Sequence, residues 1–139
     1  MFLLDTNVVS ELRKVETRAV DPHVRRWSRK LDAETAYLSV ITILELEQGV
    51  LRLERRDPRQ GAMLRVWLER IILTEYSGRI LDINREIARR CAALHVPDPR
   101  SYRDSLIAAT ALVHGMTVVT RNVADFRLTG VSVFNPWES

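Results

Sequence analysis

The chain has 139 residues, which at about 150 residues per domain predicts a single domain spanning 1–139. Apolar residues make up 46% and charged residues 28% of the chain, a globular balance that argues against intrinsic disorder. The 21 Lys and Arg residues exceed the 18 Asp and Glu residues, for a net charge of +3. This small excess is compatible with an anionic partner but does not require one.

Cysteine and histidine content narrows the possible site chemistry. Cys91 is the only cysteine, which excludes an internal disulfide and a thiolate zinc site and suits a reducing compartment. The three histidines lack metal-ligand spacing. Asp5 interrupts the apolar N-terminus before a signal peptide could form, and the longest uncharged stretch, 105–120, is too short to span a membrane. We therefore expect a soluble, cytoplasmic protein without a membrane segment.

Apolar periodicity and turn residues predict strands that alternate with helices. In chain order, the expected elements are a strand at 2–4, helices at 7–13 and 22–30, a strand at 36–40, helices at 42–56 and 59–76, a strand at 80–83, helices at 84–94 and 101–113, and strands at 116–120 and 131–134. Alternation of this kind predicts an α/β fold with a mostly parallel sheet of about five strands, covered by helices on both faces. The segment 105–113 is apolar all round, so we expect it to be the most buried helix.

Local residue chemistry marks several helix ends. Asp5 or Thr6 can cap the first helix, and Asp21 followed by proline can open the second. Gly78 and Gly115 can end helices in the left-handed conformation.

Acids and amides are expected at one edge of this sheet, because functional groups of α/β folds gather beyond the carboxyl ends of parallel strands. The candidates are Asp5, Glu45, Asp104, Asn122 and Asp125. Like charges brought together are tolerated mainly when a cation is present, so their coincidence favours function.

Glu45 lies among apolar residues, and Gly49 on its helix suggests the close approach of another backbone. The alternative for Glu45 is a structural capping box with Thr42. Asp104 can simply complement the helix dipole, and Asp5 can simply be an N-cap. No counter-charge follows Asp104 on its helix, and we expect the adjacent Arg103 to point elsewhere.

Carboxylates are the ligands that remain once thiolates and clustered histidines are excluded, and they select hard cations such as Mg²⁺ or Mn²⁺. Such an ion, with carboxylates and a phosphate, supports phosphodiester hydrolysis by activated water.

Four segments and the C-terminus form a distinctive set of motifs: LLDTNVVSE at 3–11, LSVITILEL at 38–46 with Gly49, DSLIAATA at 104–111, VTRNVADF at 119–126 and VFNPW at 133–137. Together they resemble the PIN-domain ribonucleases, specifically the VapC-type toxins of toxin–antitoxin pairs in the FitB-like branch. The resemblance covers essentially the whole chain.

The resemblance implies a parallel sheet in the order 3-2-1-4-5 and a Mg²⁺- or Mn²⁺-dependent endoribonuclease that acts on tRNA or rRNA. It also implies a homodimer, a cognate VapB-type antitoxin, and a larger complex that binds promoter DNA through the antitoxin.

Carried over by position, three acids match the family's metal-binding residues, and three polar residues match the support around them. The acids are Asp5, Glu45 and Asp104, and the polar residues are Asn7, Ser39 and Thr120. Asn122 aligns with a fourth acidic position of the family, but its amide brings no charge. Asp125 in the same loop is the alternative occupant of that position. The structural alternative for Asp125 is that it only caps the turn at Phe126.

Two basic segments, 13–30 and 52–59, can guide RNA toward the acids or can be solvated helix faces. The same helices generally receive the antitoxin in this family. Four apolar residues on them are therefore either core or interface: Val24, Trp27, Leu51 and Leu53. Because Asn122 replaces an acid, a catalytically inactive PIN-like binding protein remains the alternative to an enzyme.

Overall fold

Five parallel strands form the centre of the fold in the order β3-β2-β1-β4-β5, as the resemblance implies. The computed structural model describes residues 1–15, 17 and 19–139. The strands are β1 (Phe2–Leu4), β2 (Ala36–Ser39), β3 (Ile80–Leu81), β4 (Thr117–Val119) and β5 (Val133–Phe134). In the central register, Leu3 lies between Tyr37 of β2 and Val118 of β4.

The helices follow the predicted order, except that the single helix expected at 59–76 is divided into α4, a π-helical segment and α5. They are α1 (Thr6–Leu12), α2 (Pro22–Lys30), α3 (Val40–Arg56), α4 (Pro58–Val66), α5 (Leu73–Glu75), α6 (Arg85–Leu94) and α7 (Tyr102–His114). A π-helical segment, η2 (Trp67–Ile72), joins α4 to α5, and short 3₁₀ turns are η1 (Ala33–Thr35), η3 (Val123–Phe126) and η4 (Pro136–Glu138). Glu16 and Arg18 of the basic segment 13–30 lie outside the described residues.

Several predicted helix ends are confirmed. Asp21 caps α2 by accepting hydrogen bonds from the backbone N–H groups of His23 and Val24. Gly78 and Gly115 adopt φ values of +83° and +67°, a left-handed conformation that L side chains disfavour. The expected start of the third helix at Thr42 is wrong: α3 begins at Val40 because the Ser39 hydroxyl accepts from the backbone N–H of Ile41.

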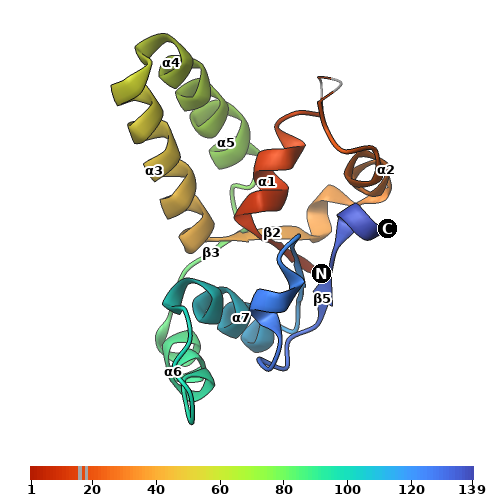
Figure 1. Cartoon of the computed structure of the whole chain (residues 1–139), viewed down its shortest axis with the longest axis vertical. Helices are drawn as coiled ribbons and strands as arrows, with labels where there is room; N and C mark the ends of the chain where they lie inside the picture. The colour runs from red at the N-terminus through yellow and green to blue at the C-terminus, as the bar shows by residue number, and fades with distance from the viewer. Residues whose placement is uncertain (16, 18) are drawn as a thin grey trace.

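Alternating residues of the central strands face two separate cores. Leu4 and Val119 pack with α1, α3 and η2, whereas Leu3 and Val118 pack with α7. Figure 1 accordingly shows α1 to α5 on one side of the sheet and α6 and α7 on the other. In α7 the segment from Ile107 to Ala111 is buried throughout, which confirms the expected buried helix.

Gly49 does not mark a close backbone approach, so that prediction is wrong. A Cβ atom built on Gly49 would meet nothing within 4 Å, whereas one on Gly61 would collide with the backbone of Glu54. The close contact is between α3 and α4, and Gly61 at the start of α4 permits it.

Among the described residues, no helix combines the length and the apolar character needed to cross a membrane.

Candidate functional site

Asp5, Glu45 and Asp104 come together beyond the carboxyl ends of β1 and β2. Asp5 directly follows β1, is fully buried, and caps α1 through a 2.8 Å hydrogen bond from the backbone N–H of Thr6. Glu45 lies in the second turn of α3, and Asp104 in the first turn of α7. Three elements distant in sequence thus bring three carboxylates to one place.

One guanidinium group joins the three acids. Arg103 Nη2 lies 2.5 Å from Asp5 Oδ1 and 2.8 Å from Glu45 Oε1, and Nη1 lies 2.9 Å from Asp104 Oδ1. Its Nε also donates to both Glu45 oxygens, at 3.1 and 3.0 Å. The expectation that Arg103 points elsewhere is therefore wrong, because the fully buried charge of Asp5 requires a cation.

The capping-box alternative for Glu45 is also wrong. Ser39, not Thr42, caps α3, and Glu45 Oε1 accepts a 2.6 Å hydrogen bond from the Thr6 hydroxyl. The carboxylate of Glu45 therefore faces the acid site instead of its own helix end. For Asp5, in contrast, the capping role and the place in the site both hold.

Polar side chains hold Asp5 from the sheet side. Its Oδ2 accepts from the Thr120 hydroxyl at 2.8 Å and from the Asn7 amide at 3.4 Å. Asn7 also accepts from the backbone N–H of Arg121 at 3.2 Å, which ties α1 to the loop after β4. Ser39 is fully buried and is engaged as the cap of α3. Asn7 and Thr120 thus support the site directly, and Ser39 supports it by fixing the start of α3.

The electrostatic environment favours the charged forms of Glu45 and Arg103. Burial raises the pKa of Glu45. Hydrogen bonds from Arg103 and Thr6, together with the charge of Arg103, lower it by more than burial raises it, so the pKa lies below its ordinary value. For Arg103, burial lowers the pKa, but hydrogen bonds and attraction from the three acids raise it above its ordinary value. Glu45 and Arg103 therefore form a charged ion pair at neutral pH.

Asn122 and Asp125 lie in a separate part of this edge. They line an open hollow with Arg121 and Glu138, and the backbone N–H of Asn122 donates to Thr120 Oγ1 at 3.0 Å. Within the described part of the chain, no hydrogen bond or ion pair joins either side chain to Asp5, Glu45 or Asp104. Their role as a fourth site position stays a prediction.

The donor set fits a hard divalent cation by its chemistry. Three carboxylates face one cationic group, and carboxylate oxygen is the ligand that Mg²⁺ and Mn²⁺ prefer. As the described side chains stand, no three of His, Cys, Asp or Glu are placed to hold a metal ion together. The acids are arranged around the Arg103 guanidinium instead.

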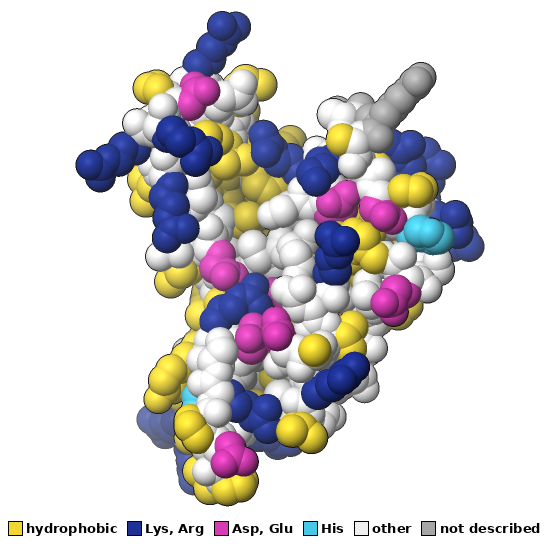
Figure 2. Space-filling view, in the orientation of Figure 1, with side chains coloured by type: hydrophobic (Ala, Val, Ile, Leu, Met, Phe, Trp, Pro, Cys, Tyr) yellow, Lys and Arg dark blue, Asp and Glu magenta, His cyan; other side chains and the backbone are white. Residues whose placement is uncertain are grey.

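A groove leads away from the acids between α1 and the α3–α4 side of the molecule. A hollow of about 190 Å³ runs from Thr6 and Glu45 to Arg13 and Trp67. The same Arg13 and Trp67 border a second hollow of about 390 Å³, lined by α1, η2 and part of α2. Figure 2 shows apolar surface at the back of this groove.

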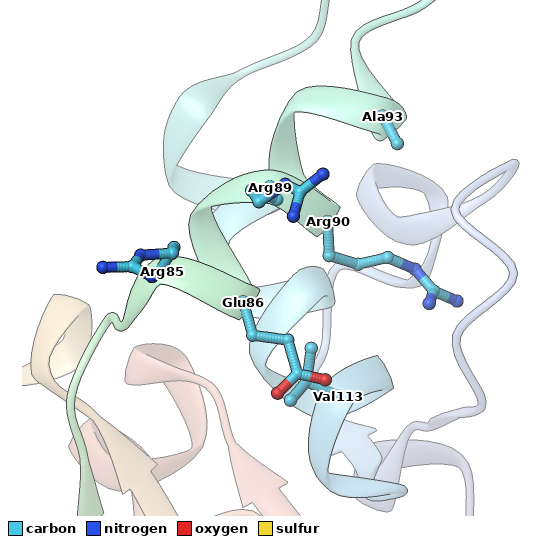
Figure 3. A pocket seen from close by; sticks show the side chains of 6 residues that line it. All are labelled: Arg85, Glu86, Arg89, Arg90, Ala93 and Val113. Atoms are coloured by element: carbon cyan, nitrogen blue, oxygen red, sulfur yellow. The ribbon is translucent and has the colours of Figure 1, made fainter.

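Another hollow lies on the opposite side of the sheet, along α6. Figure 3 shows that its arginines, Arg85, Arg89 and Arg90, point in different directions, with Glu86 among the lining residues. These arginine side chains do not converge on a common point, so the hollow does not form an anion-binding site.

Two residues of the site are not predicted from the sequence. From the sequence, Arg103 is expected to point elsewhere, and Thr6 is offered only as an alternative cap of α1. The signal that could identify both is adjacency: Thr6 follows Asp5, and Arg103 precedes Asp104, in the first turn of a helix.

Comparison with known proteins identifies similar sequences and a similar structure. The family profile described as PIN domain matches residues 2–130. The chain is 37% identical to VapC ribonuclease Y4jK of Sinorhizobium fredii and 37% identical to toxin FitB of Neisseria gonorrhoeae, in each case over 99% of both chains. The crystal structure of FitAcB from Neisseria gonorrhoeae superposes with a TM-score of 0.90 at 36% identity, covering 100% of both chains.

Proposed function

Because the chain belongs to the VapC/FitB group of PIN-domain ribonucleases, we propose that it is the toxin of a toxin–antitoxin pair and hydrolyses RNA with the help of Mg²⁺ or Mn²⁺. The observation that carries this proposal is the convergence of Asp5, Glu45 and Asp104 on one cation position. Three carboxylates from separate elements lie close together, and like charges brought together are tolerated mainly when a cation is present.

In this proposal Asp5, Glu45 and Asp104 would hold the divalent ion. The chemistry supplied there would be polarisation of a phosphoryl oxygen and activation of the attacking water. Asp5 is the fixed member, because Thr6, Asn7 and Thr120 hold both of its oxygens. Glu45 and Asp104 are partly exposed, so they form the side of the site that substrate reaches.

Arginines on the surrounding helices are suited to bring RNA to this acidic site. Arg52, Arg55, Arg56 and Arg59 are exposed around the junction of α3 and α4, where Figure 2 shows dark blue side chains. A guanidinium group binds phosphate with two parallel hydrogen bonds. These arginines offset the repulsion between RNA phosphates and the carboxylates. We expect the RNA to be a tRNA or an rRNA.

The groove between α1 and η2 is the surface that we assign to a VapB-type antitoxin. Ile71 and Trp67 line this groove; Ile71 is exposed and Trp67 is half-buried, so both are available to a partner. Leu51, on α3, is also exposed. Val24 is fully buried and Trp27 packs against Phe134, so both belong to the core instead, and Leu53 is half-buried. The proposed assembly also includes a homodimer and binding of the complex to promoter DNA through the antitoxin.

Cleavage of tRNA and rRNA by the purified protein tests the enzymatic part of the proposal. We expect cleavage of total tRNA and rRNA with Mg²⁺ or Mn²⁺, loss of cleavage with EDTA, and loss by at least about 100-fold in Asp5→Asn or Asp104→Asn. Asp82→Asn, which changes a carboxylate outside the acid site, is the matched control and should cleave like the wild type.

Two results would contradict this function. Cleavage that survives Asp5→Asn and Asp104→Asn together would show that the carboxylates are not the metal ligands. RNA binding without cleavage under every metal condition would favour the inactive, PIN-like binding protein.

A further inference from the structure

Asp5 has no free acceptor position, which limits how any cation can reach it. A carboxylate accepts about four hydrogen bonds, two on each oxygen. Oδ2 accepts from Thr120 and Asn7, and Oδ1 accepts from the Thr6 backbone and from Arg103. All four positions are filled.

Among the donors to Asp5 in the described residues, Arg103 has the longest side chain, and it takes no part in the contact between β4 and α1. The Thr6 N–H belongs to the first turn of α1, and Thr120 and Asn7 join β4 to α1. Arg103 reaches the acids with a long side chain that is 30% exposed. The hydrogen bonds of its side chain in the described structure go to the three acids and Thr6.

We propose that Arg103 is the resident counter-ion of the acid site, and that a divalent cation binds by displacing its guanidinium group from Asp5 and Glu45. This inference rests on the proposed function, since it concerns the metal ion which that function requires. Arg103 is thereby a determinant of metal affinity in addition to the three ligands.

Displacement follows from charge and from donor geometry. A guanidinium group and a divalent ion repel each other at the short distance that sharing Asp5 Oδ1 would impose. The fully buried Asp5 needs one cation, so the ion takes over the role of Arg103. Glu45 must be released as well, because Nε and Nη2 of Arg103 engage both of its oxygens.

The affinity of the site for Mn²⁺ tests this competition. Free Mn²⁺ measured by electron paramagnetic resonance gives the dissociation constant for the wild type, Arg103→Ala, Asp5→Asn and Arg121→Ala. We expect Arg103→Ala to bind Mn²⁺ about tenfold more tightly or better, since no ion pair has to be broken. Arg121→Ala removes the same charge from a side chain that lies over Trp137, and it should stay within about twofold of the wild type.

The outcomes separate this inference from the proposed function. If Asp5→Asn leaves Mn²⁺ binding unchanged, the metal site itself is wrong. If Asp5→Asn weakens binding while Arg103→Ala does not tighten it, only the counter-ion role is wrong. Equal tightening in Arg121→Ala would show a general charge effect and would also overturn the counter-ion role.

A measurement on the wild type covers the case in which Arg103→Ala does not fold. In NMR spectra of the ¹⁵N-labelled chain, the Arg103 Nε–H group should be protected from exchange in EDTA, because it donates to Glu45. Saturating Mg²⁺ should shift this signal and increase its exchange. If the backbone signals of Thr6 and Asp104 report saturation while the Nε–H signal stays unchanged, Arg103 is not displaced.

Discussion

Among single residues, Thr120 links the buried charge of Asp5 to the loop after β4. Thr120 is fully buried and donates to Asp5 Oδ2 at 2.8 Å, while its oxygen accepts from the backbone N–H of Asn122 at 3.0 Å. A buried polar group that loses its partner carries a desolvation cost. Thr120 therefore both orients Asp5 and connects the acid site to the loop after β4.

Replacing Thr120 with valine should keep the shape and remove this connection. We expect Thr120→Val to lower the free energy of unfolding by about 1–3 kcal/mol, because a buried carboxylate and a backbone N–H lose a partner. It should also weaken Mn²⁺ binding. Urea denaturation and Mn²⁺ titration measure the two effects.

Thr110→Val is the matched control. Thr110 is fully buried in α7, and its hydroxyl donates to the carbonyl of Leu106 within the same helix. Its replacement should leave Mn²⁺ affinity unchanged. If both variants alter Mn²⁺ binding equally, Thr120 has no specific role in orienting Asp5.

At the scale of elements, the α3–α4 hairpin shapes one wall of the groove. Asp57 ends α3 and caps α4, accepting from the backbone N–H of Gln60 at 3.1 Å. Arg65 on α4 forms ion pairs with Glu47 and Glu54 on α3, at 2.6 and 3.1 Å. The backbones approach most closely at Gly61, so packing at this residue determines how the two helices meet.

Alanine substitutions at two glycines should have opposite effects on stability. Gly61→Ala places a methyl group against the backbone of Glu54 and should lower the free energy of unfolding by about 1–3 kcal/mol. Gly49→Ala adds a methyl group in open space within α3 and should raise it by up to about 1 kcal/mol. Chemical denaturation of both variants gives the comparison. Equal effects would contradict the close approach at Gly61.

At the scale of the whole molecule, the two faces of the sheet have different surroundings. The face covered by α1 to α5 bears the apolar groove, and this groove reaches the acid site through Thr6 and Glu45. The opposite face carries α6 and α7, with the exposed Val96 after α6. A partner that fills the groove would thus lie next to the acids, whereas one on α6 would not.

A charge placed in the groove should separate partner binding from RNA cleavage. Ile71 is 48% exposed and lines the groove. We expect Ile71→Glu to weaken binding of the antitoxin by at least about tenfold, because burying an unpaired charge is unfavourable. Cleavage by the isolated chain should persist. Isothermal titration with the purified antitoxin measures the affinity.

Val96→Glu introduces the same charge at an exposed apolar residue outside the groove and should leave antitoxin affinity unchanged. If Val96→Glu weakens the complex and Ile71→Glu does not, the antitoxin does not occupy the groove.

The succession of strands and helices, many of their ends, and the acids at the carboxyl edge can be predicted from the amino-acid sequence alone. Apolar periodicity, the Asp21 cap and the left-handed Gly78 and Gly115 act within a few residues of chain, so they can be interpreted locally. The resemblance of five segments to one family also predicted the sheet order.

The contacts that these residues make depend on the folded chain. Arg103 is 98 residues from Asp5 and 58 from Glu45 in sequence, and the direction of its side chain depends on acids that only the fold brings within reach. The same holds for Thr6 with Glu45 and for Gly61 with Glu54. Propensities and caps act over one helical turn, whereas a buried charge selects its partner from whatever the fold places beside it.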